Sequence, residues 1–231
     1  MNKTTFVVFL SLFATSALAT ELSDAISGLE NAWSAAYYQG SEGQQKQMYP
    51  RLLKEAEELT QRYPEAAEPK IWQATIIAAN AALESTLTVL SSLETAKSLL
   101  EQAIRQNPAA LDGAAHVTLG TLYYRVPGWP ISFGDTHKAE QLLKTSLSIN
   151  PNGIDANYFY ADFLLRQDRT GEAEDYLRKA AQAPIRKQQF FADSQLQNEA
   201  KQALTNTRQH RPYPGKSKFQ SLFAAASDLS E

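Results

Sequence analysis

The sequence predicts an all-α protein, a solenoid of about four helical hairpins closed by a terminal capping helix. The first observation behind this prediction is a recurring pattern of small and large residues at positions i, i+4 and i+7, which share one helix face. The second is a proline shortly after each copy of the pattern, where it ends the helix. The third is the spacing of the last two copies, Ala139 and Ala173, which lie 34 residues apart, a length typical of helical-hairpin repeats.

Four segments carry the pattern, and each is interpreted as the second helix of a hairpin. Small residues at its first and third positions let a neighbouring helix approach closely. The first copy is the loosest, because it has leucines where the others have small residues. The copies are Leu52, Ala56 and Leu59 before Pro64; Ala96, Leu100 and Ala103 before Pro108; Ala139, Leu143 and Ser146 before Pro151; and Ala173, Leu177 and Ala180 before Pro184.

We expect the first helix of each regular hairpin just upstream, over residues 72–82, 116–124 and 155–165. In the last two, a bulky residue, a small residue and then a large one follow the same order: Leu119, Gly120 and Tyr123, then Tyr160, Ala161 and Leu164. The unit resembles a tetratricopeptide repeat, most clearly over residues 150–184, and the resemblance covers about residues 49–183. It implies a tetratricopeptide-type solenoid.

The ends of the array are less regular. Residues 31–39 and 50–62 are expected to form a first, irregular hairpin. Residues 193–206 are expected to form the terminal helix, with a polar outer face because no further repeat stacks on it. We expect the repeat domain to span residues 20–208 and to be followed by a tail of low order over 209–231.

The first nineteen residues have the features of a secretory signal peptide. A lysine near the start precedes an apolar stretch of nine residues, 6–14, and Ala17 and Ala19 are small residues at the −3 and −1 positions of a cleavage site before Thr20. Nine apolar residues fall well short of the ~20 that span a bilayer, so no membrane span is expected. We therefore expect a soluble protein of the periplasm.

Composition argues against several classes of function. Lys and Arg number 22 against 25 Asp and Glu, a net charge of -3, so no basic excess favours nucleic-acid phosphates. The chain lacks cysteine, and its three histidines are too far apart in sequence for a short-range metal pair. Motifs of nucleophilic, phosphate-binding or zinc-dependent enzymes are also absent. Asp155 and Asp162, on one helix face, are more simply explained as solvated acids, so we expect no catalytic site, metal or cofactor.

Two insertions enlarge the repeats. Residues 83–92 and 125–135 exceed the repeat length, and both fall between the two helices of a hairpin. Equivalent turns of stacked repeats lie along one edge of a solenoid. We therefore expect two enlarged loops that are neighbours in space.

The second insertion, residues 126–135, combines two prolines, two glycines and four large apolar side chains. One interpretation is packing: Trp129 and Phe133 cover the ends of the repeats, and Asp135 caps the next helix. The other is recognition, with the rigid aromatic loop forming one wall of a binding site. The packing interpretation carries more weight for Trp129.

The inner face of the first helices supplies the other candidate binding residues. Tyrosine offers a large contact area with few rotatable bonds, so Tyr124 and Tyr158 are expected to carry recognition. The alternative is that a solvated concave face simply needs polar residues. With the two loop aromatics, the candidate binding residues are Gln73, Asn80, Tyr124, Trp129, Phe133, Asp155, Asn157, Tyr158 and Asp162.

Residues 119–135 and 150–160 together give a narrower resemblance. They look like a group of exported bacterial tetratricopeptide proteins that is similar to the T component of tripartite ATP-independent periplasmic (TRAP) transporters. The resemblance implies an accessory that docks with a periplasmic solute-binding protein and shelters an apolar or organic-acid ligand. The chain lacks the cysteine by which T components can be lipid-anchored. We therefore expect a non-catalytic protein–protein interaction scaffold, with the transport accessory as the alternative.

Overall fold

The computed structural model describes residues 4–83 and 86–209, and within them the chain is helical with no β-strand. This confirms the all-α solenoid, while the expected tail lies almost entirely outside the described residues. The elements are α1 (Thr4–Gln39), α2 (Glu42–Arg62), α3 (Glu68–Ala81), α4 (Thr86–Gln106), a 3-10 turn (Ala110–Gly113), α5 (Ala114–Arg125), α6 (Thr136–Ile149), α7 (Ile154–Arg166), α8 (Thr170–Gln182), a second 3-10 turn (Lys187–Gln189) and α9 (Phe190–Arg208).

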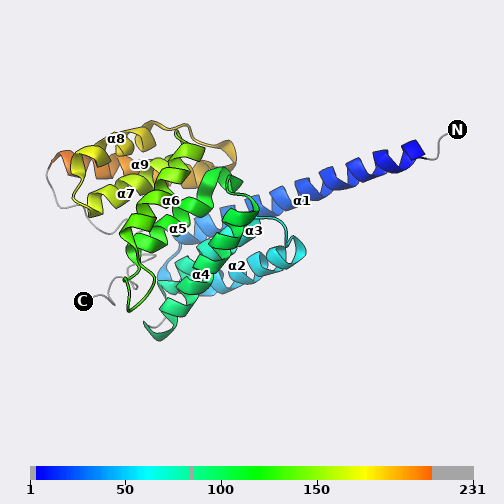
Figure 1. Cartoon of the computed structure of the whole chain (residues 1–231), viewed down its shortest axis with the longest axis horizontal. Coiled ribbons are helices and arrows are strands. Elements are labelled where there is room, and N and C mark those ends of the chain that lie inside the picture. Colours follow the sequence, from blue (N-terminus) through cyan, green and yellow to red (C-terminus); the bar gives the residue numbers. More distant parts are fainter. Residues whose placement is uncertain (1–3, 84–85, 210–231) are drawn as a thin grey trace.

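Three helical hairpins, α3/α4, α5/α6 and α7/α8, follow one another through the body of the molecule, and α9 packs against α8 at the end (Figure 1). The N-terminal part of α1 projects away from this body. The described residues contain no helix with the length and apolarity needed to cross a membrane.

The small residues of the repeat pattern lie at the contacts between helices, as expected. In α6, Ala139, Leu143 and Ser146 are fully buried. A Cβ atom on Gly120 in α5 would lie 2.9 Å from Cγ of Leu143, so glycine is what allows α5 and α6 to approach this closely. Each second helix therefore packs against its partner through the face that the sequence pattern marks.

The first hairpin differs from its expected bounds. α2 begins at Glu42, eight residues before Pro50, because Ser41 and Gln44 form a reciprocal capping box that starts the helix earlier. Pro50 lies inside α2, although a proline is more usual in the first turn of a helix. The expectation that this proline would begin the helix was wrong.

The prediction of an enlarged loop over residues 83–92 is also wrong, because α4 begins at Thr86 and includes most of the insertion. Val89 and Leu93 are 1% exposed and continue the buried face of Ala96 and Leu100 by two further turns. The insertion therefore lengthens the second helix of this hairpin.

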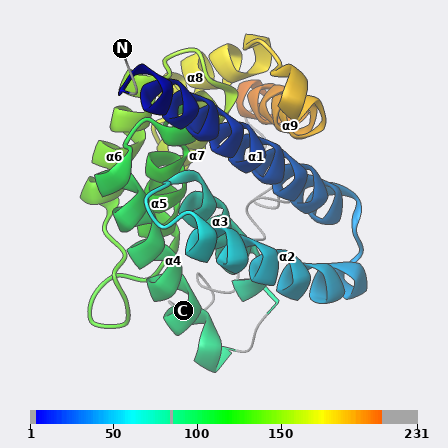
Figure 2. The same ribbon diagram turned by 90° about the vertical axis from the view of Figure 1, so that its right-hand side faces the viewer.

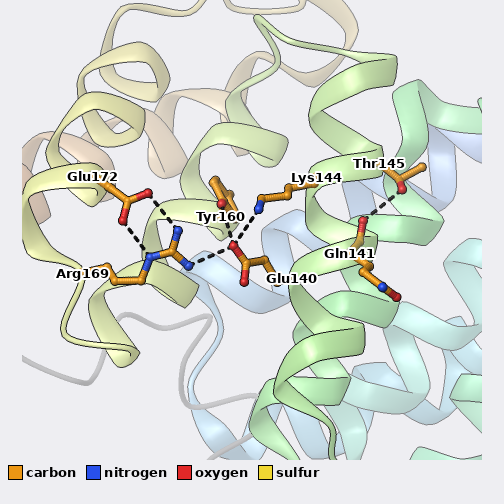
Figure 3. Close-up of polar contacts among 7 residues, drawn as sticks. All are labelled: Glu140, Gln141, Lys144, Thr145, Tyr160, Arg169 and Glu172. Atoms are coloured by element: carbon orange, nitrogen blue, oxygen red, sulfur yellow. Dashed lines mark hydrogen bonds and ion pairs between the residues drawn. The ribbon is translucent and has the colours of Figure 1, made fainter.

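A network of charged side chains holds the last two hairpins together (Figure 3). The Glu140 carboxylate in α6 accepts hydrogen bonds from Tyr160 of α7, at 3.1 Å, and from Arg169 before α8, at 2.9 Å, and it pairs with Lys144 at 2.9 Å. Arg169 also pairs with Glu172 at 2.8 Å. Hydrogen bonds from Lys144 and Arg169 lower the pKa of Glu140 to about 2, so this carboxylate is ionised at neutral pH and links three helices.

Candidate functional site

The inner face of the hairpins is covered by two of the chain's own helices. α1 packs on α2, α3 and α9, and Figure 2 shows its C-terminal part running beside α2. Trp33 of α1 stacks on Tyr37 with ring centroids 4.9 Å apart and meets Trp72 of α3 edge-on at 5.6 Å. Tyr38 meets Phe191 of α9 at 5.9 Å. The concave groove is therefore largely filled from within.

This filling changes the position of several candidate binding residues. Tyr158 is 1% exposed, and its hydroxyl donates a hydrogen bond to Glu199 of α9 at 3.1 Å. The Asn157 amide donates to the carbonyl oxygens of Pro151 and Gly153, at 2.9 and 2.8 Å, and so stabilises the start of α7. Neither side chain lies on an open face as expected, because α9 covers Tyr158 and the amide of Asn157 is bonded to the backbone before and at the start of α7.

Asp162 and Tyr124 do come together, but in a buried cluster. The Asp162 carboxylate accepts hydrogen bonds from the Tyr124 hydroxyl and from the Arg125 guanidinium, both at 2.5 Å. Side chains of Asp162 and Arg125 are each 2% exposed. Burial raises the pKa of Tyr124, so its hydroxyl remains a donor at neutral pH. Asp162 is therefore not a solvated acid, because it neutralises a buried arginine.

Three other candidates keep some exposure. Gln73 and Asn80 are half-buried on α3, and Asp155 is half-buried at the start of α7, where it pairs with Arg186 at 2.7 Å. The structure brings Asp155 beside a cavity, described below, that sequence analysis did not predict. A binding role for these three residues stays a prediction.

The loop over residues 126–135 is anchored at its base. The Asp135 amide donates to the Tyr123 carbonyl at 2.8 Å, and the Gly134 amide donates to the Pro127 carbonyl at 2.9 Å. Phe133 packs edge-on against Tyr123 with ring centroids 5.4 Å apart, and Lys97 of α4 lies 4.7 Å from the Phe133 ring centroid. The Asp135 carboxylate accepts from the Lys138 amide, which confirms that it caps α6.

The tip of this loop is exposed. Trp129 is 90% exposed and Ile131 52%, whereas Phe133 and Val126 pack on the body. The packing interpretation is therefore right for Phe133 and wrong for Trp129, since the anchoring bonds hold the base of the loop and leave its tip in solvent. A large, solvent-exposed indole on a loop whose base is fixed by hydrogen bonds is typical of a protein-binding surface.

A cavity of about 100 Å³ lies between α1 and the inner face of the repeats. Its aromatic walls are Trp33, Tyr38, Trp72 and Phe159, and its charged groups are Glu30, Asp155, Arg186 and Asp193. A second, more open cavity of about 640 Å³ lies beside it, and the two share Glu30, Leu111, Arg186 and Gln189.

Sequence analysis missed Glu30, Trp33 and Arg186 at this site. Leu29, Trp33 and Tyr37 recur every four residues, a periodicity that could have revealed the buried face of α1. Only the fold brings that face to α9 and to the loop that holds Arg186.

The fold and these sites define a tetratricopeptide-type helical solenoid whose groove is covered by its own first and last helices. Residues 131–184 match the family model of the tetratricopeptide repeat. The structure is similar to the crystal structure of a thermophilic TPR protein from Thermus thermophilus, with a TM-score of 0.55 and 21% identity, over 85% of this chain and 95% of that one. No curated protein sequence gives a significant match.

Proposed function

We propose that this protein is a non-catalytic interaction scaffold of the bacterial cell envelope that binds a protein partner through its exposed loop. The observation that carries the proposal is Trp129, 90% exposed on a loop whose base is fastened to α5 and α6. A rigid aromatic side chain loses little conformational entropy when a partner covers it, so it suits an interaction surface. Tetratricopeptide repeats are themselves typical protein-binding modules.

Export is the second part of the proposal and is supported by the composition of the first nineteen residues. We expect the mature protein to begin at Thr20 and to be found in the periplasmic fraction. Intact-mass measurement of the protein from fractionated cells checks both points. A variant with two lysines in the apolar stretch, at Val8 and Leu12, should remain in the cytoplasm at full length, and a wild-type protein that keeps Met1 as the main species would contradict export.

Partner binding should depend on the loop tip. Trp129→Ala should leave the protein folded and weaken partner binding by ~2 kcal/mol, about 30-fold, as expected for a central interface aromatic. Partners are captured from a periplasmic extract by the wild-type protein, purified, and their dissociation constants measured for both forms. Phe190→Ala is the matched control, because Phe190 is also an exposed aromatic, at 64%, but lies at the start of α9. Equal affinity of the wild type and Trp129→Ala would refute the loop as the binding surface.

The alternative function is a TRAP-transporter accessory that docks a periplasmic solute-binding protein and shelters a small organic ligand. The aromatic-walled cavity favours this alternative, although its lining residues come from the helices and their connections and not from the loop. Recovery of a solute-binding protein in the capture experiment would support the accessory role. Recovery of an outer-membrane assembly factor would support the general scaffold.

A further inference from the structure

Two adjoining cavities share one wall that contains Glu30 and Arg186. The inner cavity has aromatic walls, whereas the outer one is lined by polar and aliphatic residues without an aromatic ring, with the acids Glu68 and Asp112 among them. Glu30 and Arg186 therefore lie where a molecule would pass from the outer cavity to the inner one. The lining residues all follow Thr20, so both cavities remain in a protein cleaved at the expected site.

Charge in the shared wall is unbalanced. Arg186 pairs with Asp193 at 2.6 Å and with Asp155 at 2.7 Å, and it lies 3.8 Å from Asp112. Its charge is thus already matched by carboxylates. Glu30 is 7% exposed, and among the described residues no cation lies within ion-pair distance of it. The wall has one buried carboxylate more than its cation neutralises.

The surroundings of Glu30 disfavour its charged form. Burial raises its pKa to about 7, while a hydrogen bond with Gln189 and the positive charge of Arg186 act in the opposite direction, and Asp155 and Asp193 add to the rise. A cation bound beside Glu30 would stabilise the charged carboxylate and so offset the loss of hydration that burial causes.

Besides the Glu30 carboxylate, the site offers aromatic rings, which also favour a bound cation. Trp33, Tyr38, Trp72 and Phe159 present aromatic rings, and tryptophan is the side chain whose ring face attracts cations most strongly. A cavity needs about 10–15 Å³ to hold one water molecule. The inner cavity, with about 100 Å³, therefore accepts a body on the order of one aromatic ring.

We propose that this cavity binds a small organic cation, an ammonium group attached to an aromatic or alkyl body. The ammonium pairs with Glu30 in the shared wall, and the body lies in the inner cavity, which Trp33 and Trp72 line. An organic acid fits less well, because its carboxylate would face Glu30, Asp155 and Asp193 while Arg186 is already paired. This ligand class differs from the organic acid implied by the resemblance, and the proposal does not depend on the exposed loop.

The test uses three probes of one shape and different charge: 2-phenylethylamine, 2-phenylethanol and 3-phenylpropionate. Binding to the purified full chain is followed by tryptophan fluorescence in a Trp129→Phe background, which leaves Trp33 and Trp72 as the reporters. The amine should bind at least ten times more tightly than the alcohol, and the acid should bind more weakly still. Equal affinities for amine and alcohol, or no binding of the amine, would overturn the proposal.

Glu30→Gln removes the charge and keeps the shape of the side chain. It should weaken amine binding at least tenfold and leave the alcohol unaffected. Glu57→Gln is the matched control, because Glu57 is exposed on α2 and lines neither cavity. An unchanged amine affinity in Glu30→Gln would refute the role of Glu30.

A second readout needs no variant. Because burial raises the pKa of Glu30 to about 7, part of the Glu30 carboxyls are protonated at neutral pH, so binding of an ammonium should release protons. Calorimetry in two buffers of different ionisation enthalpy measures this release. The amine should also bind more tightly at pH 8 than at pH 6, because a larger fraction of Glu30 is ionised at pH 8 while Arg186 stays charged at both values. An affinity that does not change over this range, without proton release, would contradict the proposal.

Discussion

Replacing Asp162 with alanine should lower the free energy of unfolding by about 3–5 kcal/mol, because it leaves a buried arginine without its counter-ion. Arg125 and Asp162 are each 2% exposed in their side chains and are joined at 2.5 Å. The Tyr124 hydroxyl loses its acceptor in the same variant. The cost therefore combines an unpaired charge with an unpaired buried hydroxyl.

Urea unfolding followed by circular dichroism measures this loss. Asp175→Ala is the matched control: Asp175 forms an ion pair with Arg178, but its side chain is 66% exposed, so its removal should change stability by less than ~0.5 kcal/mol. The double variant Arg125→Met, Asp162→Leu should recover most of the stability, since it removes both buried charges. A loss below ~1 kcal/mol in Asp162→Ala would show that the pair is not buried as described.

Trp33→Ala should be comparably severe, with a loss of about 3–5 kcal/mol. Trp33 is 4% exposed and contacts the rings of Tyr37, Tyr38 and Trp72, so its removal leaves a large void between α1 and α3. Helix α1 would lose its ring contact with Trp72 of α3.

The comparison with Trp129→Ala makes this prediction specific. Both variants remove an indole, but Trp129 is 90% exposed and its loss should change stability by less than ~0.5 kcal/mol. Thermal unfolding of the two proteins in one buffer gives the difference directly. Similar stabilities for the two variants would contradict the packing of α1 in the groove.

Local pattern was sufficient to predict the repeats. Ala139, Leu143 and Ser146 mark the buried face of α6 in the sequence because helix periodicity and residue size depend on neighbours three and four positions away. The start of α2 was misjudged for a local reason as well. The capping box formed by Ser41 and Gln44 begins the helix at Glu42, eight residues before Pro50.

The candidate site was predicted less well. Tyr158 and Asp162 lie on α7, a first helix as expected, but Tyr158 is buried against Glu199 of α9 and Asp162 against Tyr124 and Arg125 of α5. Trp129 was expected to be mainly a packing residue, and nothing in the composition of its loop tells which apolar side chains face the body. Burial of this kind depends on contacts between segments far apart in the chain.

The sequence by itself therefore determined the helices, their order and the close contacts within each hairpin, because those depend on spacing along the chain. Only the tertiary structure decided that α1 would fill the groove, that Trp129 would remain in solvent, and that Glu30 and Arg186, 156 residues apart in sequence, would line the same two cavities. The physical reason is that a helix face is set by local periodicity. What covers that face is set by the free energy of burying it against a distant segment.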